Sequence, residues 1–338
     1  MEVLNVLYQS NDNYASITGV SLTSLLENNK DIDEINIYLL NDSISKTNIN
    51  KFKKVIKKYN RNIYIIDSSD ILKKLKELNV SPFKGTYTTY FKLIALSTLK
   101  IKSDLILQLD GDTIINGSLK DLIDMNLKNN ILAATYDCTM NGYKSLINIP
   151  LTDKYYNGGV LLINQKNWNK EKCTEKIIDH FKNIRNGYYT VDQDILNVLF
   201  RKKIKYLDIK YNFNSGFYIY GIKESLKMYD LKDEYYDSYE KIKNTYNNPI
   251  IYHCMGAMTG WPWELNSIHP QNDIYNKYKK ISPWKNEPLK VVNRNLIFKI
   301  QRLLYKYLPR NVYIPIHKIS QKMYLTKMDK KVQNRWKF

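Results

Sequence analysis

The segment LILQLDGDTII, residues 105–115, joins two apolar runs through two aspartates that are separated by one glycine. The run 105–109 is typical of a buried strand. Because the two carboxylates lie two positions apart where that strand ends and the backbone turns, they can converge on one point. Such a pair can supply oxygen ligands to a hard divalent cation that also binds phosphate. An Asp-Gly turn that closes a hairpin is the alternative explanation.

Short β-rich runs and helical patterns alternate along the first part of the chain. We expect strands at residues 3–10, 35–40 and 62–67, and helices at residues 17–28, 46–58 and 88–99. The last of these helices should pack beneath the strand 105–109. The alternation predicts an α/β protein in which helices cover a sheet and functional groups lie where strands run out into loops.

Length and composition limit the class of protein. A chain of 338 residues with 43% apolar content can bury a large core, as one large domain or as one domain plus an appendage. Cys138, Cys173 and Cys254 are widely spaced, so the sequence offers neither a disulfide framework nor a CxxC zinc pair. Without the pattern of a signal peptide or of a spanning helix, we expect a cytosolic protein.

The C-terminal residues differ chemically from the rest. Residues 289–338 hold 13 Lys and Arg against one acid, Asp329, which indicates a polyanionic partner, either an anionic membrane or a nucleic acid. Within this tail, the segment 295–308 has the spacing of an amphipathic helix, with apolar residues at 296, 297, 300, 303, 304, 307 and 308.

This helix could pack on the core. Its basic residues, together with Trp336 and several tyrosines, favour an interfacial membrane helix instead, which would hold the protein at the inner face of the plasma membrane. We therefore divide the chain into a domain at residues 1–285 and a basic amphipathic region at residues 286–338.

Six blocks of sequence together resemble, in order and spacing, the retaining galactosyl- and glucosyltransferases of glycosyltransferase family eight, over about residues 3–263. The blocks are NDNYASITGVSLTSLLENN (11–29), LILQLDGDTIINGSLKDL (105–122), YYNGGVLLINQKNW (155–168), VDQDILN (191–197), LDIKYNF (207–213) and IIYHCMG (250–256). The resemblance implies a GT-A fold, a UDP-sugar donor and Mn²⁺, with Mg²⁺ as the alternative. It also implies transfer of galactose or glucose to a glycan or lipid-linked glycan of the cell envelope.

The same resemblance implies a role for individual residues. The metal ligands would be Asp110, Asp112 and His253. The nucleotide would be bound by Asn11, Asn13, Tyr14, Asp110, Gly111 and Gly256. The donor sugar would be bound by Lys92, Asp137, Asn157, Gly159 and Asp192. Asp192 and Gln193 would be catalytic. Since a glutamine is a poor nucleophile, Gln193 would stabilise positive charge on the sugar ring during front-side attack by the acceptor.

The sequence departs from the family pattern at two positions. Lys92 stands where relatives commonly have arginine, so the charge is kept and the bidentate fork is lost. Relatives also follow HxxG with a Lys-Pro-Trp that contacts diphosphate, whereas this chain reads HCMGAMTGWPW, which puts Thr259 or Trp261 in the place of the lysine. A metal-dependent nuclease or other nucleic-acid-binding protein, and a non-catalytic relative, are the alternatives. We expect no nucleic-acid partner.

Overall fold

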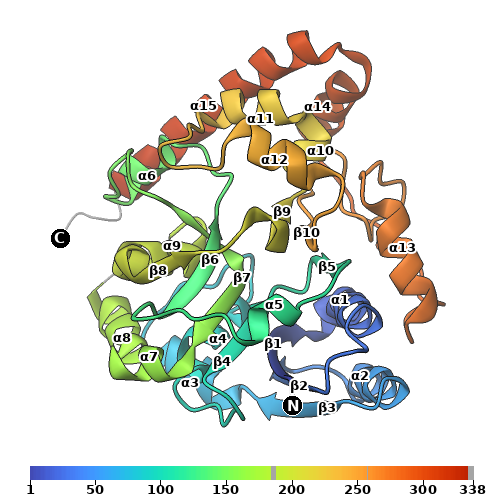
Figure 1. Ribbon diagram of the computed structural model, residues 1–338. Helices are drawn as coiled ribbons and strands as arrows, with labels where there is room; N and C mark the ends of the chain where they lie inside the picture. The colour runs from blue at the N-terminus through green and yellow to red at the C-terminus, as the bar shows by residue number, and fades with distance from the viewer. Residues whose placement is uncertain (184–187, 257, 334–338) are drawn as a thin grey trace.

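The computed structural model describes residues 1–183, 188–256 and 258–333. In this part of the chain, a mixed sheet of seven strands has the order β3-β2-β1-β4-β7-β6-β8 (Figure 1). These strands are β1 (Val3–Asn11), β2 (Glu34–Asp42), β3 (Asn62–Asp67), β4 (Leu105–Leu109), β6 (Leu132–Tyr136), β7 (Tyr156–Asn164) and β8 (Ile204–Tyr206). Strands β1 to β4 run parallel, whereas β7 is antiparallel to both of its neighbours.

Helices cover the sheet and continue to the C-terminal end of the described chain. They are α1 (Ala15–Glu27), α2 (Lys46–Lys58), α3 (Ser69–Glu77), α4 (Phe91–Ala95), α5 (Lys120–Ile123), α6 (Tyr143–Leu146), α7 (Gln165–Lys170), α8 (Cys173–Asn183), α9 (Val191–Phe200), α10 (Gly216–Tyr220), α11 (Ile222–Tyr229), α12 (Tyr239–Tyr246), α13 (Asn272–Ile281), α14 (Leu296–Tyr307) and α15 (Arg310–Gln333). Short 3₁₀ helices include η1 (Asp12–Tyr14), η2 (Thr88–Tyr90), η3 (Arg201–Lys203) and η4 (Ile209–Tyr211).

Successive side chains of a strand point to opposite faces of the sheet, and helices cover both faces. The central strands are therefore buried on both sides. In β4, Leu107 and Leu109 join a cluster with residues of α1 and α2, while Ile106 joins a second cluster with residues of α4, α8 and α9. The apolar run 105–109 therefore forms the middle of the core, as its sequence predicts. Asp110 follows directly, at the edge of the sheet where β4 and the other parallel strands end.

A second, small sheet brings a late segment of the chain to this edge. In it, β10 (Ile251–His253) lies between β5 (Thr113–Ile115) and β9 (Phe213–Asn214). The pairing of β10 with β5 is antiparallel and places His253 opposite Thr113. Residues far apart in sequence thus meet directly after the Asp-Gly-Asp turn.

The predicted strands and the first two predicted helices are confirmed, with ends within about two residues. The helix predicted at 88–99 is too long, because the structure has η2 followed by only five residues of α-helix, Phe91–Ala95. Beyond it, the hydroxyls of Ser97 and Thr98 donate to the carbonyls of Ile94 and Ala95, a local bonding pattern that competes with continuation of the helix.

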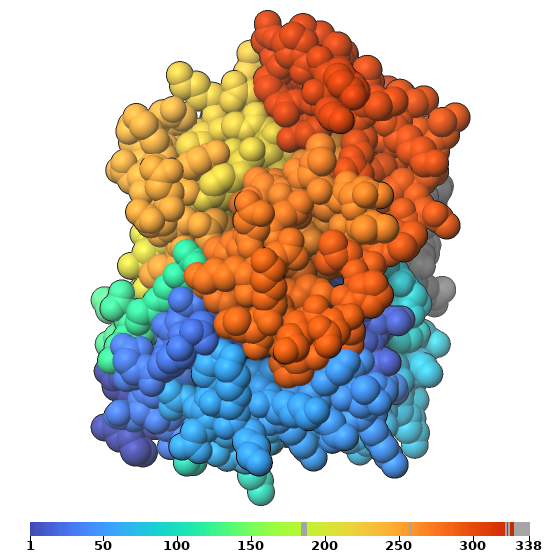
Figure 2. All heavy atoms as spheres, turned by 90° about the vertical axis from the view of Figure 1, so that its right-hand side faces the viewer, coloured from blue at the N-terminus to red at the C-terminus, as the bar shows by residue number. Residues whose placement is uncertain are grey.

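The tail forms two helices on one side of the molecule. α15 packs along α11 and reaches α6, and Figure 2 shows the C-terminal residues in red at the opposite end from the N-terminal residues in blue. Tyr305, Tyr313 and Ile314 are buried in a cluster with Ile219 and Tyr220. The tail therefore has a packed side. Trp336 lies outside the described residues.

Candidate metal and nucleotide-sugar site

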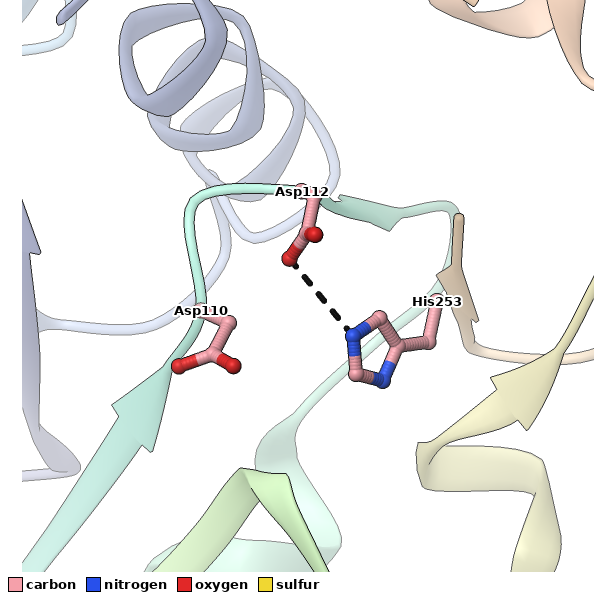
Figure 3. Close-up of side chains that lie close together, drawn as sticks. All are labelled: Asp110, Asp112 and His253. Atoms are coloured by element: carbon pink, nitrogen blue, oxygen red, sulfur yellow. Dashed lines mark ion pairs between the residues drawn. The ribbon is translucent and has the colours of Figure 1, made fainter. Parts of the chain in front are cut away.

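Three side chains that could hold a metal ion converge where β4 ends. Asp110 follows β4, Asp112 precedes β5, and His253 comes from β10 (Figure 3). One ligand atom from each of these residues lies within 4.8 Å of the others, and His253 Nε2 is 3.5 Å from an oxygen of Asp112. Two carboxylates and one imidazole form a donor set that suits Mn²⁺, and the carboxylates also suit Mg²⁺. The residues present therefore fit a divalent cation.

The three groups influence one another's protonation. Burial raises the pKa of Asp110. Burial would also raise the pKa of Asp112, but the hydrogen bond and charge of His253 outweigh it and lower that pKa. Burial would lower the pKa of His253, but Asp112 outweighs it and raises that pKa. Because a metal binds neutral imidazole, metal binding here has to release the proton that this pair favours.

Asn212 orients the imidazole from the other side. Its side-chain oxygen lies 2.9 Å from Nδ1 of His253, and its amide nitrogen donates to Asn157 Oδ1 at 2.8 Å. Asn157 in turn donates to Asp137 Oδ1 at 2.6 Å. These hydrogen bonds connect the metal cluster with the residues predicted to bind the donor sugar. Asn212 belongs to the block LDIKYNF (207–213), but its role was not predicted from the sequence.

Lys92 lies between the metal cluster and Asp192. Its side chain is fully buried, and its ammonium group is 2.6 Å from Asp192, 3.5 Å from Asp110 and 2.8 Å from the carbonyl of Gly158. Burial would lower the pKa of Lys92, but the charges of Asp110 and Asp192 outweigh it and raise that pKa. The ammonium therefore stays charged and holds the two carboxylates in place, and its three contacts match the three donors that a lysine has.

Gln193 has a fixed amide group. Its oxygen accepts a hydrogen bond from Gly158 N at 2.9 Å, and its nitrogen lies 3.2 Å from the hydroxyl of Tyr155. That hydroxyl donates to Asp194 at 2.6 Å, and Asp194 also accepts from the N–H of Thr190.

The turn before Gln193 is strained, because Val191, a β-branched residue, has a φ of 36°. Tyr155 and Asp194 support Gln193, and neither was predicted from the sequence to do so. The second acid of the block VDQDILN is the sequence feature that could have pointed to Asp194.

A cavity of about 420 Å³ adjoins the cluster, and Asn11, Tyr14, Asp110, Gly111 and Asp112 line it. The hydroxyl of Tyr14 donates to Asp112 at 3.2 Å. The side-chain oxygen of Asn11 also accepts from Tyr14 N, so it caps η1 as well.

The other two residues predicted to bind the nucleotide lie outside this lining. Asn13 is exposed, and Gly256 lies under the ring of Trp261, where a Cβ would come within 2.4 Å of ring atoms. Of the six residues predicted to bind the nucleotide, four thus line one cavity, namely Asn11, Tyr14, Asp110 and Gly111.

The segment after HxxG supplies aromatic rings to the cavity. Trp261 and Trp263 line it and stack at a centroid distance of 4.9 Å. Thr259 is buried, and its hydroxyl bonds to the carbonyls of Gly256 and Gly260. Neither Thr259 nor Trp261 therefore brings a charge into the cavity.

Known proteins resemble this chain over most of its length. The family model described as "Glycosyl transferase family 8" matches residues 5–265. The lipopolysaccharide 1,2-glucosyltransferase of Escherichia coli is 30% identical over 315 residues, which cover 90% of this chain and 87% of that protein. The lipopolysaccharide 1,3-galactosyltransferase of Salmonella typhimurium is 28% identical over 291 residues, covering 83% and 79%.

Solved structures share the fold. Galactosyltransferase LgtC, in complex with donor and acceptor sugar analogs, has a TM-score of 0.65 at 24% identity and covers 83% of this chain and 96% of its own. The bifunctional glycosyltransferase WbbM has a TM-score of 0.67 at 20% identity, over 85% of this chain and 51% of that one. The fold is of the GT-A type, as the family resemblance implies.

Proposed function

We propose that this chain, a member of glycosyl transferase family 8 and a hexosyltransferase, transfers galactose or glucose from a UDP-sugar. The acceptor would be a glycan in lipopolysaccharide synthesis. The relatives named as glucosyl- and galactosyltransferases suggest the two sugars. The observation that carries the proposal is the convergence of Asp110, Asp112 and His253 beside the cavity that Asn11 and Tyr14 line. A metal-dependent nuclease is not favoured by the family.

The chain's own residues have distinct tasks in this reaction. Asp110, Asp112 and His253 would hold Mn²⁺, which when bound supplies Lewis-acid stabilisation of the charge on the departing UDP. Lys92 holds Asp192 where its carboxylate can bind hydroxyls of the donor sugar. Asp137 and Asn157, which are hydrogen-bonded to each other, would also bind this sugar.

Gln193 would stabilise the sugar ring while the bond to UDP breaks. Its amide is held by Gly158 and Tyr155, so its oxygen dipole needs no reorganisation as positive charge develops. An amide is a weak nucleophile, which favours front-side attack by the acceptor hydroxyl and retention of configuration. A phosphate oxygen of UDP can accept the proton of that hydroxyl, so the protein need not supply a separate base.

The tail would attach the enzyme to the inner face of the plasma membrane, where it could meet a lipid-linked acceptor. Residues on one side of α14 are exposed although they are apolar, namely Leu296, Ile297, Ile300, Leu303 and Tyr307. Lys299 and Lys306 of the same helix are exposed too, which suits an anionic surface. None of the helices in the described chain is both long and apolar enough to cross a bilayer.

Hydrolysis of UDP-sugars tests the proposal most directly. Purified protein should hydrolyse UDP-galactose or UDP-glucose slowly when Mn²⁺ is added, and EDTA should stop the reaction. Asp112→Asn should abolish both the hydrolysis and the Mn²⁺-dependent binding of UDP, while Asp70→Asn, an exposed aspartate of α3, should change neither. Metal-independent binding of UDP by the Asp112→Asn protein at the affinity of the unaltered protein would show that the metal assignment is wrong.

A further inference from the structure

The donor cavity lacks the lysine that relatives place after HxxG, and a diphosphate next to three acids needs cationic partners. Asp110, Asp112 and Glu264 line the cavity, so one acid there, Glu264, lies outside the metal cluster. Thr259 and Trp261 supply no charge, as described above. Another cation of this chain would therefore have to bind the phosphates.

Several cations beside the cavity already have partners. Lys92 is held between Asp192 and Asp110. Arg294 pairs with Glu264 at 2.5 Å. Lys290 donates to the main-chain carbonyl of Asn13. Lys92 and Arg294 therefore already neutralise acids, and Lys290 already uses one of its three donors on the main chain.

Lys84 differs from these residues. It lines the cavity together with Asp110 and Asp112, and its ammonium group forms no ion pair and no hydrogen bond with any residue that the structure describes. Its nitrogen lies 5.0 Å from the centroid of the Phe83 ring, which also lines the cavity.

The backbone presents Lys84 in a defined way. Phe83 and Thr86 exchange two main-chain hydrogen bonds of 2.8 and 3.0 Å, with Lys84 and Gly85 between them. Both central residues have positive φ, 48° and 83°, which is the geometry of a type I′ turn. Thr86 and the neighbouring Thr88 bond to Asp42 at the end of β2, so the turn is anchored to the central sheet.

We propose that Lys84 binds the diphosphate of the nucleotide-sugar donor and so takes over the task of the lysine that relatives carry after HxxG. An ammonium group without an anionic partner, on an anchored turn that lines the same cavity as Asp110 and Asp112, has the charge that this task requires. The inference rests on the proposed function, because it assumes that the cavity receives UDP.

Calorimetric titration of UDP in Mn²⁺ tests this inference. Lys84→Gln should weaken UDP binding about tenfold, the size expected for one charge-assisted hydrogen bond. Binding of uridine, which has no phosphate, should not change. Lys84→Arg keeps the charge and should restore most of the affinity, and Lys74→Gln, an exposed lysine of α3, should have no effect.

The outcomes separate the inference from the proposed function. If unaltered protein fails to bind UDP in Mn²⁺, the proposed function is wrong and the inference falls with it. If unaltered protein binds UDP and the Lys84→Gln protein, folded by circular dichroism, binds it equally well, the role of Lys84 alone is wrong. An equal loss for UDP and uridine would also overturn it, because the effect would then not lie at the phosphates.

Discussion

Nδ1 of His253 and Oδ1 of Asn212 lie 2.9 Å apart. Since an amide oxygen only accepts, the imidazole must carry a hydrogen on Nδ1, which leaves Nε2 as the nitrogen that faces Asp112. The amide of Asn212 therefore selects the tautomer of His253 that can bind a metal ion through Nε2.

Removal of this hydrogen bond should weaken metal binding. Asn212→Leu has a similar volume and no acceptor, so we expect the affinity for Mn²⁺ to fall 10- to 100-fold, measured by electron paramagnetic resonance of free Mn²⁺. Asn212→Asp keeps an acceptor and should retain more of the affinity. Equal Mn²⁺ affinities for the unaltered and Asn212→Leu proteins would show that the hydrogen bond does not position His253.

Lys92 should be needed for folding as well as for activity. Lys92→Met removes the cation and leaves Asp110 and Asp192 close together beneath the site, so the free energy of unfolding should drop by about 3–5 kcal/mol. Urea denaturation followed by tryptophan fluorescence gives this value. Lys102→Met is the control, because Lys102 forms a solvent-exposed ion pair with Glu34, which should contribute little to stability. A comparable loss in both variants would contradict the assigned role.

Gly159 leaves room for the imidazole of His253. A Cβ at this position would lie 2.3 Å from Cε1 of His253, so Gly159→Ala should push the imidazole away from Asp112. We expect Mn²⁺-dependent hydrolysis of UDP-sugar to fall by at least about tenfold. Gly117→Ala is the matched control, since its Cβ would meet Ile250 at an ordinary 3.4 Å. A fully active Gly159→Ala protein would refute this account of the site.

The part of the site that could be predicted from sequence lies in continuous motifs. The Asp-Gly-Asp turn follows a strand whose apolar run is recognisable, and the six blocks match a family, so the candidate metal ligands could be named. Asn212 and Tyr155 could not, because their partners lie 41 and 38 residues away in sequence. Such contacts depend on how β7, β9 and β10 come together, and hydrophobic periodicity carries no information on that arrangement.

The exposed side of α14 should bind anionic membranes. Truncation of the tail would be an ambiguous test, because Tyr305 and Tyr313 are buried against Tyr220. Substitution of Leu296, Ile300 and Leu303 by glutamine leaves that packing intact, since these side chains are 71%, 48% and 55% exposed. We expect the triple variant to stay in the supernatant when vesicles rich in phosphatidylglycerol are sedimented at low salt, while UDP-sugar hydrolysis is unchanged.

The control for this experiment is Leu151→Gln, which changes an apolar side chain of similar exposure, 47%, in a loop outside the tail. This variant should sediment with the vesicles like the unaltered protein. If the triple variant also sediments with the vesicles, the apolar side of α14 is not the membrane contact. If the unaltered protein does not sediment at all, the proposal that the tail attaches the protein to a membrane is wrong.

Acid should loosen the contact between the tail and the rest of the molecule through His317. Burial lowers the pKa of this imidazole to about 4, and its ring stacks on Tyr220 at 5.3 Å and on Tyr313 at 5.4 Å. The pKa of an unfolded histidine is about 6.5. Between these two pH values the unfolded chain binds more protons at His317 than the folded protein does. The contribution of His317 to the free energy of unfolding is therefore complete above about pH 6.5 and is lost as the pH falls towards 4.

His317→Gln removes this dependence on pH. Within the window the free energy of unfolding of the unaltered protein should fall by about 1.4 kcal/mol per pH unit on account of His317 alone. His269, whose pKa burial also lowers to about 4, remains in the variant and contributes a slope of its own. Urea denaturation at several values between pH 4.5 and 6.5 should therefore give a shallower slope for His317→Gln than for the unaltered protein. Parallel slopes would mean that His317 takes up its proton without disturbing the packing of α15, and the predicted acid sensitivity of the tail would be wrong.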